Sequence, residues 1–128
     1  MRLLLDTCTF LWIVGGAKEL SPRAREAFAD PANEVFLSAV SAWEIAVKHR
    51  LGKLPLPSPP EEFVPTQRTA HGIEPLPVDE EAALHVAKLP GLHRDPFDRM
   101  LVAQALVGGL VLLSPDDPIR QYPVRTLW

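Results

Sequence analysis

Short apolar segments alternate with longer segments of helical periodicity along the whole chain, and this alternation restricts the fold more than any other feature. The apolar segments have the length of strands and predict them at residues 2–5, 34–37, 73–76, 110–113 and 124–127, the last at a sheet edge. Strands that alternate with helices are typical of βαβ units and a parallel sheet. With 128 residues the chain is expected to form a single α/β domain, residues 1–128, around a central, mostly parallel sheet.

Capping residues mark the starts of several predicted helices. Ser21-Pro22 and Asp95-Pro96 each place a capping side chain before a proline at the first helical position. Together with apolar periodicity, such signals predict helices over about 9–14, 22–30, 42–51, 60–71, 80–87 and 96–108.

The helix expected after residue 41 contains a candidate functional acid. Ser41 and Glu44 have the spacing of a capping box, which would place Glu44 in the first helical turn. Trp43, Val47 and Leu51 recur at four-residue intervals and predict an apolar face. We expect Trp43 to lie in the core on this basis.

The composition is that of a soluble cytoplasmic protein. The single cysteine, Cys8, excludes an intramolecular disulfide and favours a reducing compartment. Asp6 interrupts the apolar N-terminal run, so that run does not read as a signal peptide, and no segment has the ~20 apolar residues of a membrane span. A formal net charge of -3 argues against attachment to nucleic acid through overall charge, although a local basic rim remains compatible with it.

Four acidic residues stand where a parallel sheet would gather functional groups. Asp6 and Asp116 follow predicted strands, and Glu44 and Asp98 lie near the starts of predicted helices. Such groups meet beyond the carboxyl ends of parallel strands. Each acid by itself also has a structural explanation, as a turn residue or as a favourable charge at a helix start. The joint pattern points to a shared acidic centre.

A shared carboxylate centre requires compensation by positive charge, because like charges in a cleft of low dielectric repel strongly. Mg²⁺ prefers such oxygen ligands, and Mn²⁺ is a second candidate. An ion of this kind can polarise a phosphodiester and activate a water molecule. Zinc is less favoured, since there is one cysteine and the four histidines lack paired ligand spacing.

Four stretches together resemble the PIN-domain family, in particular its VapC-type toxins. They are LLLDTCTFLW, VSAWEIAVKHRLGKL, LHRDPFDRMLVAQAL and LLSPDDPIRQYPVRTLW, in this order along the chain. The resemblance implies a three-layer α/β/α domain and an endoribonuclease dependent on Mg²⁺ or Mn²⁺. It further implies an RNA substrate, a cognate antitoxin protein as partner, and a homodimer without membrane association.

The resemblance also assigns residues to roles. The family's four acids fall on Asp6, Glu44, Asp98 and Asp116, as catalytic residues and metal ligands. Asp117 leaves open which of the two tandem acids points inward. Candidates for hydrogen bonds to these acids or to water molecules on the metal are Thr7 and Ser114. Asp95 is a candidate for the same role or for an additional metal ligand, ranked below Asp98.

Several other side chains have both a structural and a functional explanation. Lys48, Arg94 and Arg99 are candidate RNA contacts, but Lys48 is also explained as part of a solvated helix face, and the two arginines could instead pair with carboxylates. His93 is expected as a surface residue at a helix entry, with a catalytic role as the alternative. Trp12 and Trp43 are expected in the core, with contact to an antitoxin as the alternative, and Cys8 is expected as a small buried residue rather than a nucleophile.

Two other functions compete with the nuclease. In a phosphatase of the aspartyl-phosphate type, Asp6 would be the nucleophile. Such enzymes use a second acid two residues later, but neither Cys8 at that position nor the following Thr9 is acidic, and there is no evident catalytic lysine. A receiver domain lacks support for a similar reason. A non-catalytic metal-binding or interaction module is the other alternative, and the presence of all four acids argues against it.

Overall fold

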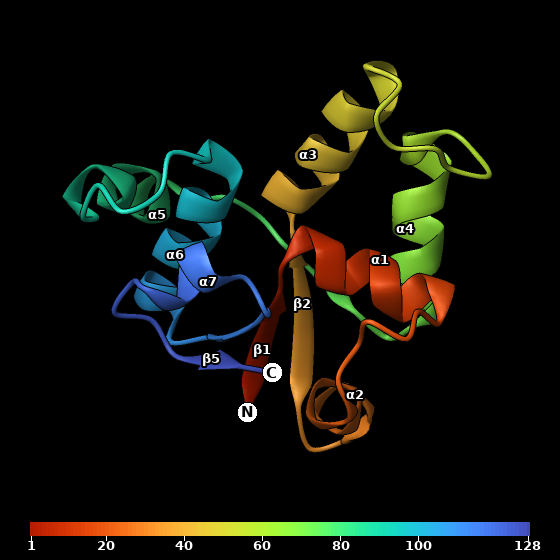
Figure 1. Cartoon of the computed structure of the whole chain (residues 1–128), viewed down its shortest axis with the longest axis horizontal. Helices are drawn as coiled ribbons and strands as arrows, with labels where there is room; N and C mark the ends of the chain where they lie inside the picture. Colours follow the sequence, from red (N-terminus) through yellow and green to blue (C-terminus); the bar gives the residue numbers. More distant parts are fainter.

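The computed structural model describes all residues from 1 to 128, and it contains a five-stranded sheet in which every pairing is parallel (Figure 1). In chain order the elements are β1 (Arg2–Leu5), α1 (Thr7–Gly15), α2 (Pro22–Ala29), β2 (Glu34–Ser38), α3 (Ala39–Arg50), α4 (Pro60–Ala70), β3 (Glu74–Leu76), α5 (Glu80–His85), a 3₁₀ turn (Val86–Lys88), α6 (Pro96–Gly108), β4 (Val111–Leu113), α7 (Asp117–Arg120) and β5 (Thr126–Leu127). All five predicted strands are present, each within about two residues of its predicted bounds.

The strand order places the N-terminal strand at the centre of the sheet. The order is β3-β2-β1-β4-β5, so the chain builds one half outward from β1 before it returns to build the other half. β1 therefore pairs with β2 on one side and with β4 on the other. This reversal opens a crevice at the carboxyl ends of β1 and β4, which is where ligands bind in open α/β sheets.

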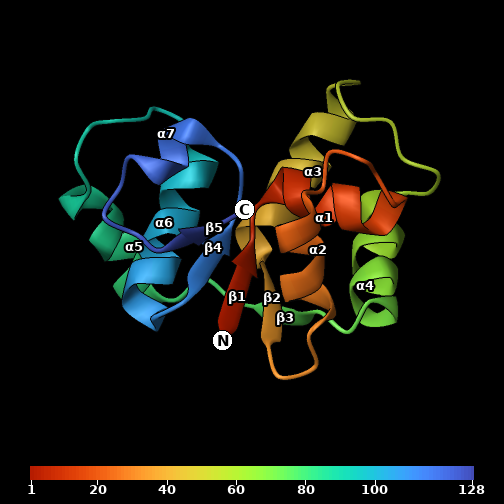
Figure 2. The ribbon, with the colours of Figure 1, turned by 60° about the horizontal axis from the view of Figure 1, so that its bottom comes forward.

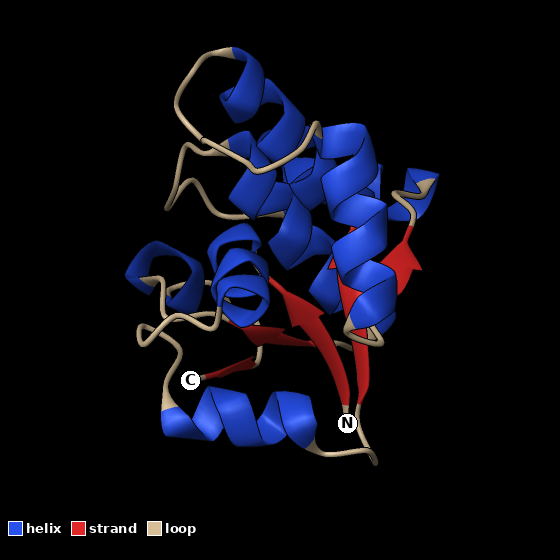
Figure 3. Ribbon diagram, turned by 90° about the vertical axis from the view of Figure 1, so that its right-hand side faces the viewer, coloured by secondary structure: helices blue, strands red, loops and turns tan.

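Helices cover both faces of the sheet, which confirms the predicted three-layer α/β/α arrangement (Figures 2 and 3). The alternation of side chains along β1 creates the two layers of core: Leu3 and Leu5 pack with residues of α1, α2, α3 and α4, whereas Leu4 faces α6 and α7. β4 repeats the pattern, with Val111 and Leu113 on the first face and Leu112 on the second. A buried strand with both faces covered explains the continuous apolar runs in the sequence.

The predicted capping box at Ser41 is wrong. β2 continues to Ser38, whose hydroxyl accepts a hydrogen bond from the backbone N–H of Val40 and caps α3. Ser41 therefore lies inside the helix, and Glu44 lies in its second turn, facing the interior. Ser38 is the better cap because it stands where the extended backbone of β2 turns into the helix.

The other differences concern element ends. α1 starts at Thr7 rather than Thr9, because the side chain of Asp6 caps it and accepts a hydrogen bond from the N–H of Thr9 at 2.8 Å. α4 runs through Pro65 without interruption. None of the helices is long and apolar enough to span a membrane.

Candidate active site

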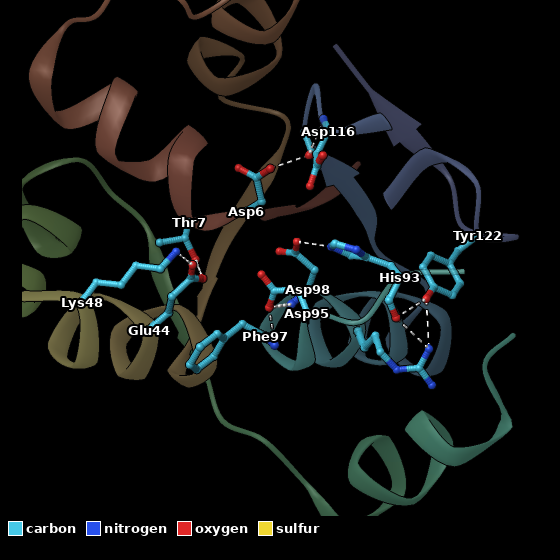
Figure 4. Close-up of polar contacts among 12 residues, drawn as sticks. Asp6, Thr7, Glu44, Lys48, His93, Asp95, Phe97, Asp98, Asp116 and Tyr122 are labelled. Carbon is cyan, nitrogen blue, oxygen red and sulfur yellow. Dashed lines mark hydrogen bonds and ion pairs between the residues drawn. The ribbon is translucent and has the colours of Figure 1, made fainter. Parts of the chain in front are cut away.

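The four predicted acids line a single cleft at the carboxyl ends of β1 and β4. This cleft, the acidic cleft below, has a volume of about 340 Å³ and is lined by Asp6, Thr7, Cys8, Trp12, Glu44, Lys48, Asp95, Asp98, Pro115 and Asp116. Figure 4 shows the acids reaching toward a common space from separate elements. The crevice that the strand order opens is thus filled with carboxylates.

Asp6 is held at both of its carboxylate oxygens. It directly follows β1, and as the cap of α1 it accepts a hydrogen bond from Thr9 N–H at Oδ1. Oδ2 accepts a short hydrogen bond from the hydroxyl of Ser114, which directly follows β4. Because the side chain is 5% exposed, these contacts fix the carboxylate against the end of the sheet.

Glu44 approaches the acidic cleft from α3. Its Oε1 accepts a hydrogen bond from the hydroxyl of Thr7 at 2.7 Å, and its Oε2 forms an ion pair with Lys48 one turn later. The hydroxyl of Thr7 also lies 3.0 Å from the hydroxyl of Ser41, and both of these residues are buried. The inward face of α3 is therefore polar at this point.

The start of α6 contributes two acids and brings a histidine beside them. Asp95 caps the helix through hydrogen bonds from the N–H groups of Phe97 at 2.9 Å and Asp98 at 3.3 Å. Asp98 Oδ2 lies 2.9 Å from Nε2 of His93 (Figure 4). His93 lies at the helix entry, as expected, but its side chain is only 23% exposed and is turned toward the acids.

The structure settles which of the tandem acids faces inward. Asp116 lines the acidic cleft, and its backbone N–H donates to the hydroxyl of Ser114 at 3.1 Å. The side chain of Asp117 is 87% exposed and lies 3.8 Å from Arg120. Donor atoms of Asp116, Asp98 and His93 lie within 4.8 Å of one another, the tightest grouping of possible metal ligands in the molecule.

Burial raises the pKa values of two of the acids. Desolvation is the largest cause for Asp6, whose pKa is raised despite the hydrogen bonds from Ser114 and Thr9, and Asp116 adds repulsion. The pKa of Asp98 rises to about 6, chiefly through desolvation and then through the nearby Asp95, Asp116 and Glu44, while the hydrogen bond from His93 opposes the rise. The protein alone therefore pays an energetic cost to keep these carboxylates ionised together.

The residues of the acidic cleft fit a divalent cation. The donor set is dominated by carboxylate oxygens, which hard cations prefer. Lys48 is the one basic side chain lining the cleft, and its ion pair with Glu44 raises the pKa of its own ammonium group. Asp98 and Asp116 offer oxygens within 4.8 Å of each other, while Asp6 and Glu44 line the same cleft with other hydrogen-bond partners.

Three further expectations need correction. Trp43 is not in the core: it is 60% exposed and meets Phe97 edge-on, with ring centroids 5.0 Å apart. Cys8 is exposed in the acidic cleft rather than buried, but desolvation and the charges of Asp6 and Glu44 raise the pKa of its thiol, which opposes a role as nucleophile. Trp12 is half-buried against Trp128.

Arg99 has structural partners that the sequence did not indicate. Its guanidinium donates to the carbonyl oxygens of Pro90 and Val86 and to the hydroxyl of Tyr122, at 2.9 to 3.0 Å. Arg99 forms no ion pair with a carboxylate, and these contacts with the protein argue against the expected contact of Arg99 with RNA. Arg94 is exposed and remains available for that role.

Residues 3–124 match the PIN domain. The chain is a member of the PIN-domain family. This match covers nearly the whole of the domain and confirms the family resemblance seen in the sequence. Within the family, the chain is 48% identical over 56 residues to Ribonuclease VapC16 of Mycobacterium tuberculosis. That match covers 44% of the present chain and 40% of the relative. The chain therefore aligns with less than half of the length of VapC16.

Solved structures agree with this PIN fold over its full length. VapBC2 from Rickettsia felis, solved bound to a DNA fragment from the promoter, superposes with a TM-score of 0.73 at 13% identity, covering 99% of this chain and 98% of that one. DNA-bound VapBC from Salmonella typhimurium gives a TM-score of 0.69 at 19% identity, covering 99% and 97%. At such low identities the comparison establishes the fold alone.

Proposed function

We propose that this PIN-domain protein is an endoribonuclease that depends on Mg²⁺ or Mn²⁺ and acts as the toxin of a toxin–antitoxin pair. The observation that carries the proposal is the convergence of Asp6, Glu44, Asp98 and Asp116 on one cleft from four separate segments of the chain. Family membership and the partial match to a named ribonuclease support it. Because the acidic cleft lies at the strand-order reversal, the acids occupy the position where the fold binds ligands.

The four acids of the acidic cleft and the hydroxyl groups that contact them each have a part in the proposed reaction. A bound divalent cation would offset the charge of the carboxylates and polarise the phosphodiester and a water molecule. Asp98 and Asp116 are the acids placed to hold it, with Asp6 beside them. Ser114 fixes Asp6, and Thr7 fixes Glu44, so that neither carboxylate must be reoriented during the reaction.

Two basic side chains, those of Lys48 and Arg94, are proposed to contact the RNA backbone. Lys48 lies at the margin of the acidic cleft with a half-exposed side chain, where it can meet a phosphate group. Arg94 is exposed and immediately precedes Asp95, which lines the same cleft. Basic groups beside an acidic centre reconcile RNA binding with a net charge of -3.

The proposal predicts RNA cleavage that requires a divalent cation. Purified protein would be incubated with a pool of structured RNAs in Mg²⁺, in Mn²⁺ and in EDTA, with the same RNAs without protein as the control. We expect cutting with either metal and none in EDTA. Cutting that persists in EDTA would contradict the metal-dependent mechanism, and release of phosphate from small phosphate esters without RNA cutting would favour the phosphatase.

The structure gives little support to the two competing functions, the phosphatase and the non-catalytic metal-binding module. A phosphatase of the aspartyl-phosphate type would need a second acid at position 8, which is the free Cys8. The next residue, Thr9, is fully buried, and its hydroxyl donates to the carbonyl of Leu113. A module that only binds metal would not need the fixed orientation that Ser114 and Thr7 give to Asp6 and Glu44. The nuclease explains these contacts best.

The proposed partner is an antitoxin, as in the VapBC complexes with the same fold. An apolar groove between α3 and α4 is the surface we assign to it. The groove has a volume of about 440 Å³, and its lining includes Ala42, Val64, Pro65 and Leu76, with Arg68 as its one charged residue. Co-expression with the adjacent open reading frame should yield a stable complex, and Ala42→Asp should disrupt that complex while leaving RNA cleavage by the free protein intact.

A further inference from the structure

One imidazole nitrogen lies beside the carboxylates of the acidic cleft, and its placement goes beyond the four-carboxylate pattern. His93 lies in the loop before α6, and its Nε2 is 2.9 Å from Oδ2 of Asp98. Asp116 supplies a third donor atom, and all three donor atoms lie within 4.8 Å of one another. The three residues come from different positions around β4 and α6, yet they face the same point (Figure 4).

The separation of the histidine and aspartate donors suits a shared ion. Adjacent ligands at right angles on an ion with bonds of ~2.1 Å are ~3 Å apart. The 2.9 Å between Nε2 of His93 and Oδ2 of Asp98 matches this spacing. In the metal-free protein the same two atoms are hydrogen-bonded. A cation could therefore take the place of this hydrogen bond without a large movement of either side chain.

A hydrogen-bonded clamp holds the loop that presents His93. The carbonyl oxygen of His93 accepts a hydrogen bond from the hydroxyl of Tyr122 at 3.4 Å. The same hydroxyl accepts from Arg99 at 3.0 Å, and Arg99 also donates to the carbonyls of Pro90 and Val86. Tyr122 is 3% exposed, so the clamp is anchored in the core of the α6 face. Arg99 and Tyr122 are thus positioning residues for His93.

We propose that His93 is a direct ligand of the divalent cation, beside Asp98 and Asp116, and that it biases the acidic cleft toward Mn²⁺ over Mg²⁺. Imidazole nitrogen is a better ligand for transition metals than for Mg²⁺, which takes oxygen ligands. The inference rests on the proposed function, since it concerns the ion that the nuclease uses. It adds a nitrogen ligand and an order of metal preference to that function.

Electron spin-echo spectroscopy of bound Mn²⁺ tests this directly, because modulation by a coordinated nitrogen reports the ligand itself. The full-length protein would be loaded with Mn²⁺ and compared with His93→Gln and with His85→Gln, a histidine at the end of α5 and outside the acidic cleft. We expect nitrogen modulation in the wild type and in His85→Gln, a change of that modulation when the histidines carry ¹⁵N, and its loss in His93→Gln.

Metal titration gives the second measurement. Followed through the signal of free Mn²⁺, His93→Gln should bind Mn²⁺ about tenfold more weakly. Its affinity for Mg²⁺, measured by displacement of Mn²⁺, should change by less than about threefold. Tyr122→Phe removes the clamp's hydroxyl but keeps its ring, and it should weaken Mn²⁺ binding by a smaller factor while retaining the modulation.

The outcomes separate this inference from the function on which it rests. Bound Mn²⁺ without nitrogen modulation in the wild type would overturn the role of His93, while metal-dependent RNA cutting would still support the nuclease. Equal losses of Mn²⁺ and Mg²⁺ affinity in His93→Gln would overturn the preference. Failure of the wild type to bind Mn²⁺ would overturn this inference, and failure to bind either Mn²⁺ or Mg²⁺ would also contradict the metal-dependent function.

Discussion

The hydroxyl of Ser114 donates a hydrogen bond to the carboxylate of Asp6, across 108 positions of sequence. The contact exists because β1 and β4 are neighbours in the sheet and end at the same level, with Leu5 beside Leu113. Each residue directly follows its strand. The pairing of the two strands therefore sets the orientation of an acid in the acidic cleft.

Ser114→Ala should reduce RNA cleavage by about tenfold, because it leaves one oxygen of Asp6 without its donor. Ser114→Thr keeps the hydroxyl and is expected to retain most of the activity. The measurement is the cleavage rate at saturating metal for both variants. Equal activity of Ser114→Ala and the wild type would show that the hydrogen bond does not orient Asp6 for the reaction.

The helix α3 shows where sequence reasoning fails and why. The spacing of Trp43, Val47 and Leu51 predicted the apolar face, but Trp43 and Leu51 are 60% and 62% exposed. The helix instead turns Ser41 and Glu44 inward, where Thr7 binds both. Periodicity assigns apolar residues to the interior, so a helix that buries polar residues for a functional site is read with the wrong face inward.

The strands and the helix that border the acidic cleft could be predicted from short stretches of sequence. Asp6 and Asp116 follow apolar runs that can only be buried strands, and Asp95-Pro96 marks a helix start with a side chain and a rigid ring. The contact of His93 with Asp98 was not predicted, because no local sequence pattern ties the two residues together. The position of His93 depends on contacts with Arg99 and Tyr122, the latter 29 residues away in sequence.

Asp98→Asn should stabilise the metal-free protein at pH 8. The pKa of Asp98 is raised to about 6 by burial, so the folded state binds its proton more tightly than the unfolded state. In the wild type, the protonated carboxyl of Asp98 stabilises the folded state fully below about pH 4, and this contribution is lost as the pH rises through about 6. Asparagine stays neutral, and we expect a gain of about 1 kcal/mol after allowance for solvent screening.

Calorimetry in EDTA at pH 5 and pH 8 would measure this effect. The advantage of Asp98→Asn over the wild type should be larger at pH 8, and Mn²⁺ should abolish it by stabilising the wild type alone. A lower melting temperature for the variant at pH 8 in EDTA would refute the view that the ionised acid strains the free protein.

Gln104 ties the end of β2 to α6 inside the molecule. It is 4% exposed, accepts a hydrogen bond from Ser38 at 2.6 Å and donates to the carbonyl of Pro77 at 3.2 Å. Gln104→Ala removes the acceptor of the buried Ser38 hydroxyl and the donor to the carbonyl of Pro77, and it should lower the free energy of unfolding by about 2 kcal/mol. Urea unfolding measures this, with the exposed Gln121→Ala as the control. Similar effects of the two changes would show that the buried contacts contribute nothing.

Lys48→Gln tests the proposed contact with the RNA backbone. If Lys48 meets a phosphate, the variant should bind RNA more weakly, and its slope of log affinity against log salt should fall by about one. Fluorescence anisotropy in EDTA measures binding without cleavage. Lys88→Gln, an exposed lysine outside the acidic cleft, is the matched control. An unchanged salt slope in Lys48→Gln would assign Lys48 to Glu44 alone.

The tandem acids provide the most direct test of the central claim that the acidic cleft is the catalytic centre. Asp116 lines the cleft, whereas Asp117 is exposed beside Arg120. Replacing either aspartate by asparagine is the same chemical change at adjacent positions, so the two variants differ only in where the side chain lies. The measurement is the rate of RNA cleavage by Asp116→Asn and Asp117→Asn in saturating Mn²⁺. The structure predicts a loss of at least about 100-fold for Asp116→Asn and near wild-type activity for Asp117→Asn. Equal activities of the two variants would contradict the assignment of the catalytic centre to this cleft.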